Sequence, residues 1–136
     1  MDLGELRAHC LAKPGADESY PFGPGALVMK VAGKIFAIVG EDDRPLTVSL
    51  KCEPEIAIVL REQYAAVTPG YHLSKRHWNT VALDGSVPEA KVFDWIDDSY
   101  DLVIEGLPRR VRAELDVRDE SKEDEDGRRE RSLHRR

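Results

Sequence analysis

The segment ALVMKVAGKIFAIV, residues 26–39, decides the fold of this chain. Its two halves are mostly apolar and suited to β-strands. The two residues between them, Ala32-Gly33, have the length of a tight hairpin loop in which glycine supplies a positive φ. The segment therefore predicts an antiparallel β-hairpin.

The hairpin loop also predicts which residues pair across the two strands. Counting back from the loop puts Met29 opposite Phe36. The next pair on the same face is Leu27 with Ile38. The later run Leu46–Lys51 alternates apolar and polar side chains, which predicts a half-buried strand whose apolar side joins the same core.

Helices are expected before and after these strands along the chain. Asp2 is a suitable cap for a first helix because Glu5, three residues on, completes a capping box. Lys13-Pro14-Gly15 ends that helix. A second helix begins near Pro54, and a third covers about residues 88–106. The apolar stripe expected along the second helix consists of Ile56, Val59 and Leu60.

The order of these elements predicts an α+β fold. Five strands are expected in all, at residues 18–22, 26–31, 34–39, 46–51 and 78–83. They form an antiparallel sheet with helices packed on one face, a two-layer arrangement. The adjacent acids Asp97 and Asp98 of the third helix are expected to be solvated.

Charge divides the chain into a domain and a tail. Residues 109–136 carry 19 charged side chains in 28 positions, and from about residue 119 the composition is that of a disordered segment. Residues 1–108 carry 10 basic and 17 acidic side chains, a net charge of −7. This acidity argues against attraction of the whole domain to nucleic acid, but it leaves room for a local basic patch.

The chain has the character of a reduced cytoplasmic protein. No run approaches the roughly 20 apolar residues of a membrane span, and the N-terminus is unlike a secretion signal. Cys10 and Cys52 are too few for a disulfide framework or a zinc ligand set. No cofactor, metal or membrane association is expected, and a monomer is favoured over an oligomer.

No catalytic set emerges from the residue pattern. His72 and His77 are five residues apart without a third ligand at a fixed spacing, so a structural or surface role is favoured over metal binding. Cys52 follows a strand and precedes a helix, where a thiol pKa can fall, but no partner histidine is identifiable. A buried, unreactive thiol is the favoured interpretation, and an enzyme is not expected.

The polar face of the predicted sheet is the better candidate for function. Its members are cations, hydroxyls and one indole, at Lys30, Thr47, Ser49, Lys51, Trp78 and Thr80. Such side chains suit phosphate contacts and base stacking, but on these residues alone an ordinary solvated sheet face is the favoured interpretation. The segment YHLSKRHWNT, residues 71–80, adds further ionisable and aromatic groups beside a Pro-Gly turn, where functional loops are common.

Several blocks of the sequence resemble the MmcQ/YjbR family. These are PGYHLSKRHWNTVALDGSVP at 69–88 and DDSYDLVIEGLP at 97–108, preceded in order by KPGADESYPFG at 13–23, KVAGKIFAIVG at 30–40 and VSLKCEPE at 48–55. The resemblance covers about residues 1–108. It implies an antiparallel-sheet fold similar to secretion chaperones and frataxin-like proteins, with a double-wing mode of DNA binding.

The resemblance also implies which residues contact DNA. They are Tyr71, His72, Lys75, Arg76, His77, Trp78 and Asn79, together with Lys30, Lys34 and Lys51 on the strands. The leading hypothesis is a non-catalytic module that binds DNA weakly and without sequence preference. The alternative is a chaperone-like protein-interaction module that docks partners on the open sheet face. A basic strip would favour the first, and an exposed apolar patch the second.

Overall fold

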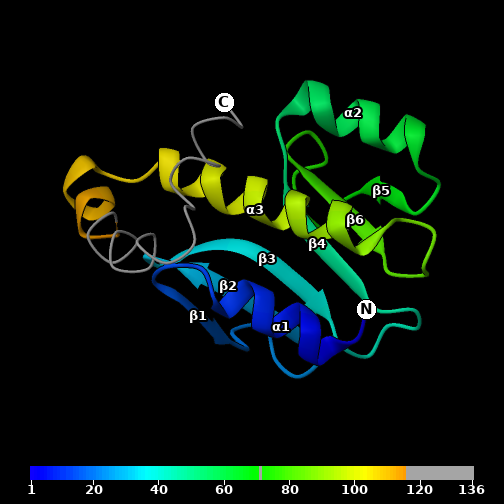
Figure 1. Cartoon of the computed structure of the whole chain (residues 1–136), viewed down its shortest axis with the longest axis horizontal. Helices are drawn as coiled ribbons and strands as arrows, with labels where there is room; N and C mark the ends of the chain where they lie inside the picture. Colours follow the sequence, from blue (N-terminus) through cyan, green and yellow to red (C-terminus); the bar gives the residue numbers. More distant parts are fainter. Residues whose placement is uncertain (71, 116–136) are drawn as a thin grey trace.

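A computed structural model describes residues 1–70 and 72–115 of the chain (Figure 1). Its elements, in order, are α1 (Leu3–Leu11), β1 (Ala16–Ser19), β2 (Ala26–Val31), β3 (Lys34–Gly40), β4 (Thr47–Lys51), α2 (Pro54–Gln63), β5 (Val67–Pro69), β6 (Trp78–Ala82) and α3 (Glu89–Glu105). Residues 109–115 form a further short helical segment. The disorder predicted from about residue 119 lies outside the described residues.

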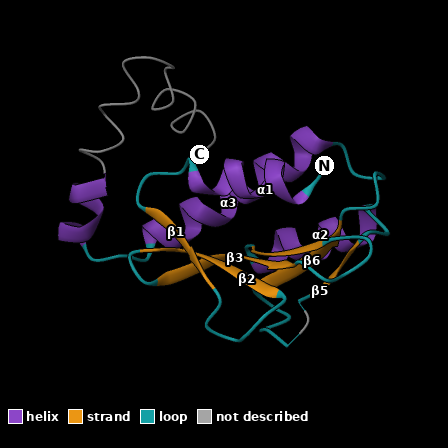
Figure 2. Ribbon diagram, turned by 90° about the horizontal axis from the view of Figure 1, so that it is seen from below, coloured by secondary structure: helices purple, strands orange, loops and turns teal. Residues whose placement is uncertain are grey.

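The strands form one antiparallel sheet in the order β1-β2-β3-β4-β6-β5. The helices α1 and α3 lie across one face of this sheet (Figure 2). The predicted α+β class with helices on one side is therefore confirmed. The sheet has one strand more than the five expected, because β5 is only three residues long and too short to show a period-two pattern.

The first helix begins as its sequence predicts. The Asp2 carboxylate accepts a hydrogen bond from the Glu5 amide at 2.8 Å, and the Glu5 carboxylate accepts one from the Asp2 amide at 3.2 Å. Both amides would otherwise lack partners at the helix end. Leu6 and Cys10, one turn apart, are fully buried against the sheet.

The hairpin is confirmed, but the predicted register is wrong by one residue. Ala32 and Gly33 both have positive φ, at 50° and 78°, which suits the right-handed twist of the two strands. Beyond the turn the pairing shifts, so that Met29 lies opposite Ala37 rather than opposite Phe36. Phe36 is the extra residue of a β-bulge and packs edge-to-face on Tyr100.

A serine from α3 completes the hydrogen bonding where β3 bulges. The Ser99 hydroxyl donates to the Phe36 carbonyl at 2.6 Å and accepts from the Lys51 amide at 2.9 Å. It thereby bridges β3 and β4, and it has no solvent exposure. The helix layer is thus tied to the sheet by a polar contact as well as by apolar packing.

Asp97 is buried, and the expectation that it is solvated is wrong. It is 4% exposed because α1 covers this side of α3. Its Oδ1 lies 2.5 Å from Lys13 Nζ and 2.8 Å from His9 Nε2. Burial opposes ionisation, but the hydrogen bonds from His9 and Lys13 outweigh it and lower the pKa of Asp97 well below its ordinary value.

The side of α2 that faces the core is not the side that its sequence predicts. Ile56 and Val59 of the predicted apolar stripe are 49% and 47% exposed, and Ala57 is buried instead. The reason is that Ala57 faces β6, where its carbonyl accepts a hydrogen bond from Asn79. A methyl side chain allows this close approach, and the larger aliphatic groups point elsewhere.

The apolar core reaches from α1 to the end of the described chain. It lies between the sheet and the helices, and Leu115, beyond the predicted domain boundary at residue 108, is buried in it. Within residues 1–70 and 72–115, none of the helices combines the length and apolar character needed to cross a membrane.

Candidate functional site

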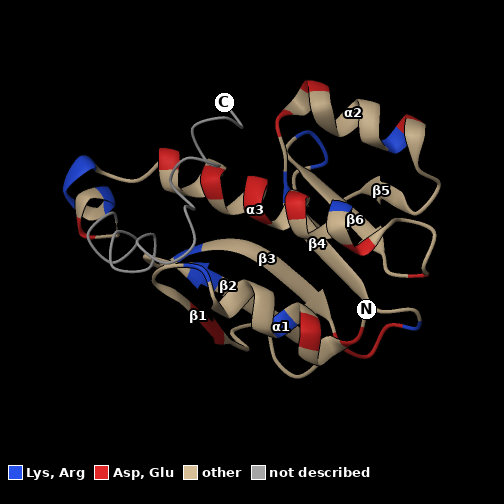
Figure 3. Cartoon of the chain, in the orientation of Figure 1, with Lys and Arg blue, Asp and Glu red and all other residues tan. Residues whose placement is uncertain are grey.

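Four strands have one end each at the same end of the sheet, and cations that are far apart in the sequence lie there. β2 and β4 end at this point, and β3 and β6 begin there, because neighbouring strands are antiparallel. Figure 3 shows blue segments at the β2–β3 hairpin, at the end of β4 and in the loop before β6. We call this set the basic sheet end, and it consists of Lys30, Lys34, Lys51, Lys75 and Arg76.

The polar face predicted for the sheet is present. Ser49 and Thr80 lie opposite each other with their hydroxyls 2.8 Å apart, and Lys51 lies opposite Trp78. Lys30, Lys51 and Trp78 are each half-buried, whereas Lys34 at the hairpin tip is exposed. The indole therefore borders the cations and keeps part of its surface in solvent.

Backbone contacts hold the loop before β6 against the end of β4. The His77 carbonyl accepts a hydrogen bond from the Cys52 amide at 2.8 Å, and the Gly70 amide donates to the Trp78 carbonyl at 2.8 Å. His72, Lys75, Arg76 and His77 are exposed on this loop. Tyr71, also predicted to contact DNA, lies outside the described residues.

Arg61 on α2 supports the same loop, a role that no local sequence pattern indicated. Its Nη1 donates to the Lys75 carbonyl at 3.1 Å. The two residues are 14 positions apart and belong to different elements, so only the packing of α2 beside the loop places them together. This contact adds a sixth positive charge next to the basic sheet end.

Asn79 lies apart from the other predicted contact residues. It alternates with Trp78 and Thr80, so its side chain lies on the helix-covered face of the sheet, opposite Leu50. It is 3% exposed and donates from Nδ2 to the Ala57 carbonyl at 3.3 Å. The other described residues that were predicted to contact DNA lie at the basic sheet end or on the loop before β6, whereas Asn79 does not.

Acidic side chains also lie on the sheet and on the helix that covers it. Asp17 lies opposite Lys30 across β1 and β2. On the helix side, acids recur along one stripe of α3 (Figure 3), at Asp94, Asp98, Asp101 and Glu105. Such neighbours reduce the attraction of a polyanion to the basic sheet end, and they limit the affinity that its cations can supply.

Neither cysteine has the properties of a nucleophile. Both are free, Cys10 buried and Cys52 half-buried. Burial raises the pKa of Cys10 to about 12 and that of Cys52 to about 11, so both thiols stay protonated at neutral pH. Across residues 1–70 and 72–115, no three His, Cys, Asp or Glu side chains are grouped as metal ligands.

Comparisons with known proteins agree on one family. The family model described as YjbR matches residues 11–102. The uncharacterized protein YjbR of Escherichia coli (strain K12) is 42% identical over 115 residues, which cover 85% of this chain and 98% of that protein. The uncharacterized protein YbdF of Escherichia coli O157:H7 is 36% identical over 100 residues, 74% of this chain and 82% of that protein.

The solved structures show the same fold. A crystal structure of a Deinococcus radiodurans protein matches with a TM-score of 0.79 and 37% identity, covering 83% of this chain and 86% of that one. A Pseudomonas syringae protein matches with a TM-score of 0.66 and 25% identity, covering 75% and 98%.

Proposed function

The chain belongs to the YjbR family, and we propose that it is a non-catalytic module that binds DNA weakly and without sequence preference through its basic sheet end. One observation supports this proposal above others. Five cations predicted from separate sequence segments lie at the same end of one sheet, and Trp78 lies among them. Positive side chains neutralise phosphates, and an indole stacks on any base.

The proposed contacts explain why binding should be weak. Lys34, Lys75 and Arg76 are exposed, whereas Lys30 and Lys51 are half-buried. About three phosphate contacts are therefore expected, and few contacts to the phosphate backbone mean low affinity at physiological salt.

Removing Lys75 and Arg76 together should weaken DNA binding and its salt dependence. We expect the Lys75→Ala/Arg76→Ala variant to flatten the plot of log affinity against log salt by up to about 2 units. Unrelated duplex sequences should lose affinity equally, because phosphate contacts carry no sequence information. Fluorescence anisotropy of labelled duplexes at several salt concentrations measures both effects.

A matched control removes the same charge elsewhere. Arg109 and Arg110 are also adjacent and exposed, but they lie in the helical segment beyond α3, at the far left of Figure 3. The Arg109→Ala/Arg110→Ala variant should leave the salt slope within about 0.5 units of the wild-type value. Equal changes in both variants would show that net charge alone, and not the basic sheet end, governs binding.

A protein-docking function is the second candidate, and the exposed apolar surface of α2 favours it. Ile56, Ile58 and Val59 are 49%, 53% and 47% exposed. Ile56 and Val59, three positions apart, lie on the same side of the helix, and exposed apolar side chains grouped in this way are typical of an interaction surface. It lies on α2, so this candidate would use the helix layer rather than the open sheet face expected from the sequence. A photo-cross-linking residue at Ile58 should then capture a partner that the same residue at Asp94 does not.

A further inference from the structure

We infer that the cavity between α2 and α3 binds an uncharged small molecule with an apolar body, poor in hydrogen-bonding groups. The cavity has a volume of about 530 Å³, within the range of sites for small molecules. It lies over β4, β5 and β6 on the helix-covered side of the sheet. Lys51 belongs to the edge of the cavity as well as to the basic sheet end, and the proposed ligand contacts do not include it.

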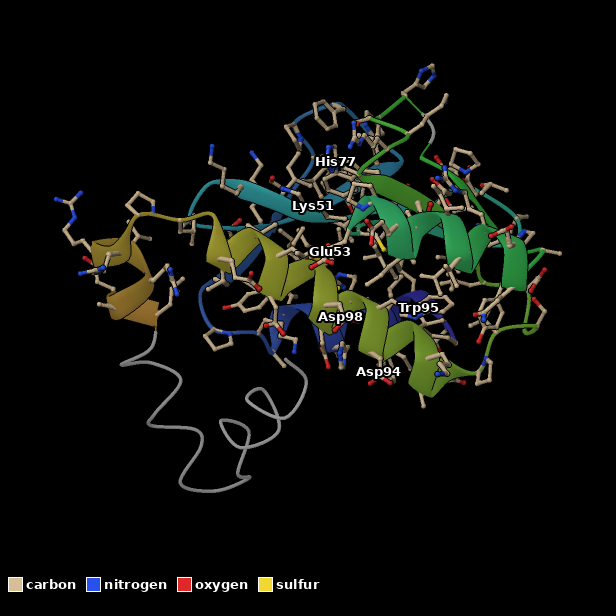
Figure 4. The ribbon with its side chains drawn as sticks, turned by 90° about the horizontal axis from the view of Figure 1, so that it is seen from above. Lys51, Glu53, His77, Asp94, Trp95 and Asp98 are labelled. Carbon is tan, nitrogen blue, oxygen red and sulfur yellow. The ribbon has the colours of Figure 1, made fainter. Side chains whose placement is uncertain are left out.

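The inner surface of the cavity is mostly apolar. Buried strand residues form its floor and half-buried helix residues its walls, and they are Leu50, Val67, Val81, Leu60, Trp95 and Leu102. Figure 4 shows Trp95 on the side of α3 that faces α2. Its indole packs edge-to-face on Tyr64 with 5.3 Å between ring centroids, which holds it at the wall. The walls keep apolar surface in water, and a ligand that covers this surface gains free energy in proportion to the area buried.

The carboxylates of the lining do not select a charged ligand. Glu53, Asp98 and Glu105 are exposed to solvent, and Asp101 is half-buried. Asp98, Asp101 and Glu105 each already take part in an interaction of their own. Solvent and these interactions weaken their attraction for a cation, and carboxylates offer no partner to an anion. The apolar surface is therefore the main source of affinity.

The polar groups of the floor offer no hydrogen bond to a ligand. Asn79 is 3% exposed, its Nδ2 donates to the Ala57 carbonyl, and its Oδ1 is shielded from solvent. The Cys52 amide donates to the His77 carbonyl at 2.8 Å. A ligand that carries several hydrogen-bonding groups would give up its bonds to water without gaining partners at this floor, and that exchange is costly. This favours a ligand with few such groups.

A series of straight-chain alcohols tests the apolar contribution. We would titrate the full chain with butan-1-ol, pentan-1-ol and hexan-1-ol by calorimetry. Each added methylene should tighten binding about fourfold, because each one buries further apolar surface. Hexylamine and hexanoate have the same alkyl chain with a positive or a negative group, and they should bind no more tightly than hexan-1-ol.

Thiol labelling assigns the binding to the cavity in the wild-type protein. Cys52 is half-buried and lines the cavity, so a bound alcohol should shield it from a thiol reagent. Hexan-1-ol at about four times its Kd should slow the labelling of Cys52 about fivefold. The control is a thiol introduced by Gln63→Cys, since Gln63 is exposed on α2 and does not line the cavity. Its labelling rate should not change.

A substitution that fills the cavity gives a second assignment. Leu102→Trp should lower the affinity for hexan-1-ol about tenfold, because the larger side chain occupies space in which the alkyl chain would be buried. Gln63→Trp adds the same indole outside the cavity and should leave the affinity unchanged. If Leu102→Trp does not fold, the protection of Cys52 in the wild type still decides.

The inference is overturned if the alcohols do not bind, if their affinity does not rise with chain length, or if hexylamine or hexanoate binds more tightly than hexan-1-ol. It is also overturned if hexan-1-ol leaves the labelling of Cys52 unchanged, or if folded Leu102→Trp and Gln63→Trp bind it equally. None of these results bears on the DNA proposal, because its test changes Lys75 and Arg76, which do not line the cavity.

Discussion

The Asp97→Asn variant should unfold with a free energy about 3–5 kcal/mol lower than that of the wild type at neutral pH. The change keeps the shape of the side chain and removes its charge. Lys13, whose side chain is 11% exposed, then loses the carboxylate that lies 2.5 Å from its ammonium. An uncompensated buried charge is the costly outcome, and the contact between α1 and α3 weakens with it. Urea denaturation followed by circular dichroism measures the loss.

The difference in stability between the wild type and Asp97→Asn should depend on pH. The pKa of Asp97 is lowered in the folded protein, so its ionised form stabilises the fold above the ordinary aspartate pKa, about 4. That contribution declines as the pH falls below about 4, where the unfolded chain binds a proton, and it is lost entirely only below the lowered pKa of the folded carboxylate. The advantage of the wild type over Asp97→Asn should therefore shrink steadily on acidification from pH 4.

Asp94→Asn is the control for both measurements. Asp94 is exposed on the same helix, so its neutralisation should change stability by no more than about 0.5 kcal/mol. If Asp97→Asn were as stable as Asp94→Asn at neutral pH, the buried carboxylate would not link the two helices as described.

The Ser99→Ala variant should be destabilised by about 2–4 kcal/mol. The substitution removes one oxygen and creates no clash, but it takes away the acceptor of the Lys51 amide and the donor to the Phe36 carbonyl. Each buried backbone group left unsatisfied costs about 1–3 kcal/mol. Because these groups belong to β4 and β3, the two strands should separate more easily at the bulge.

Amide hydrogen exchange tests the bridge that the Ser99 hydroxyl makes between β3 and β4. The Lys51 amide should lose its protection in Ser99→Ala more than the amides at the centre of β4 do. Ser74→Ala, at an exposed loop position, should leave stability and exchange unchanged. Full protection of Lys51 in Ser99→Ala would show that the strands pair without the hydroxyl bridge.

Local patterns predicted the elements of this fold better than their pairing. The hairpin, the Asp2 cap and the helix at Pro54 follow from neighbouring residues and are confirmed. At the shifted register, the Phe36 carbonyl accepts a hydrogen bond from Ser99, which is 63 residues away. A pattern read along one strand cannot reveal a bulge that a distant helix supports.

The candidate site was predictable only in part, because the packing of distant elements places some of its residues. The cations of the hairpin and the loop are visible in the sequence, and antiparallel pairing brings them together. The position of Asn79 was predictable as well, since the strand alternation that buries Val81 also buries Asn79. Arg61 and the cavity were not, because they arise from the way α2 packs beside the loop and α3.

A salt titration of the wild-type protein with DNA tests whether the basic sheet end binds phosphates. Affinity for a labelled duplex of ~20 base pairs would be measured from low to physiological salt, alongside a single strand of the same length. We expect measurable binding at low salt, a slope of log affinity against log salt near −3, and poor binding at physiological salt. The absence of binding at low salt, or binding that does not depend on salt, would contradict this expectation.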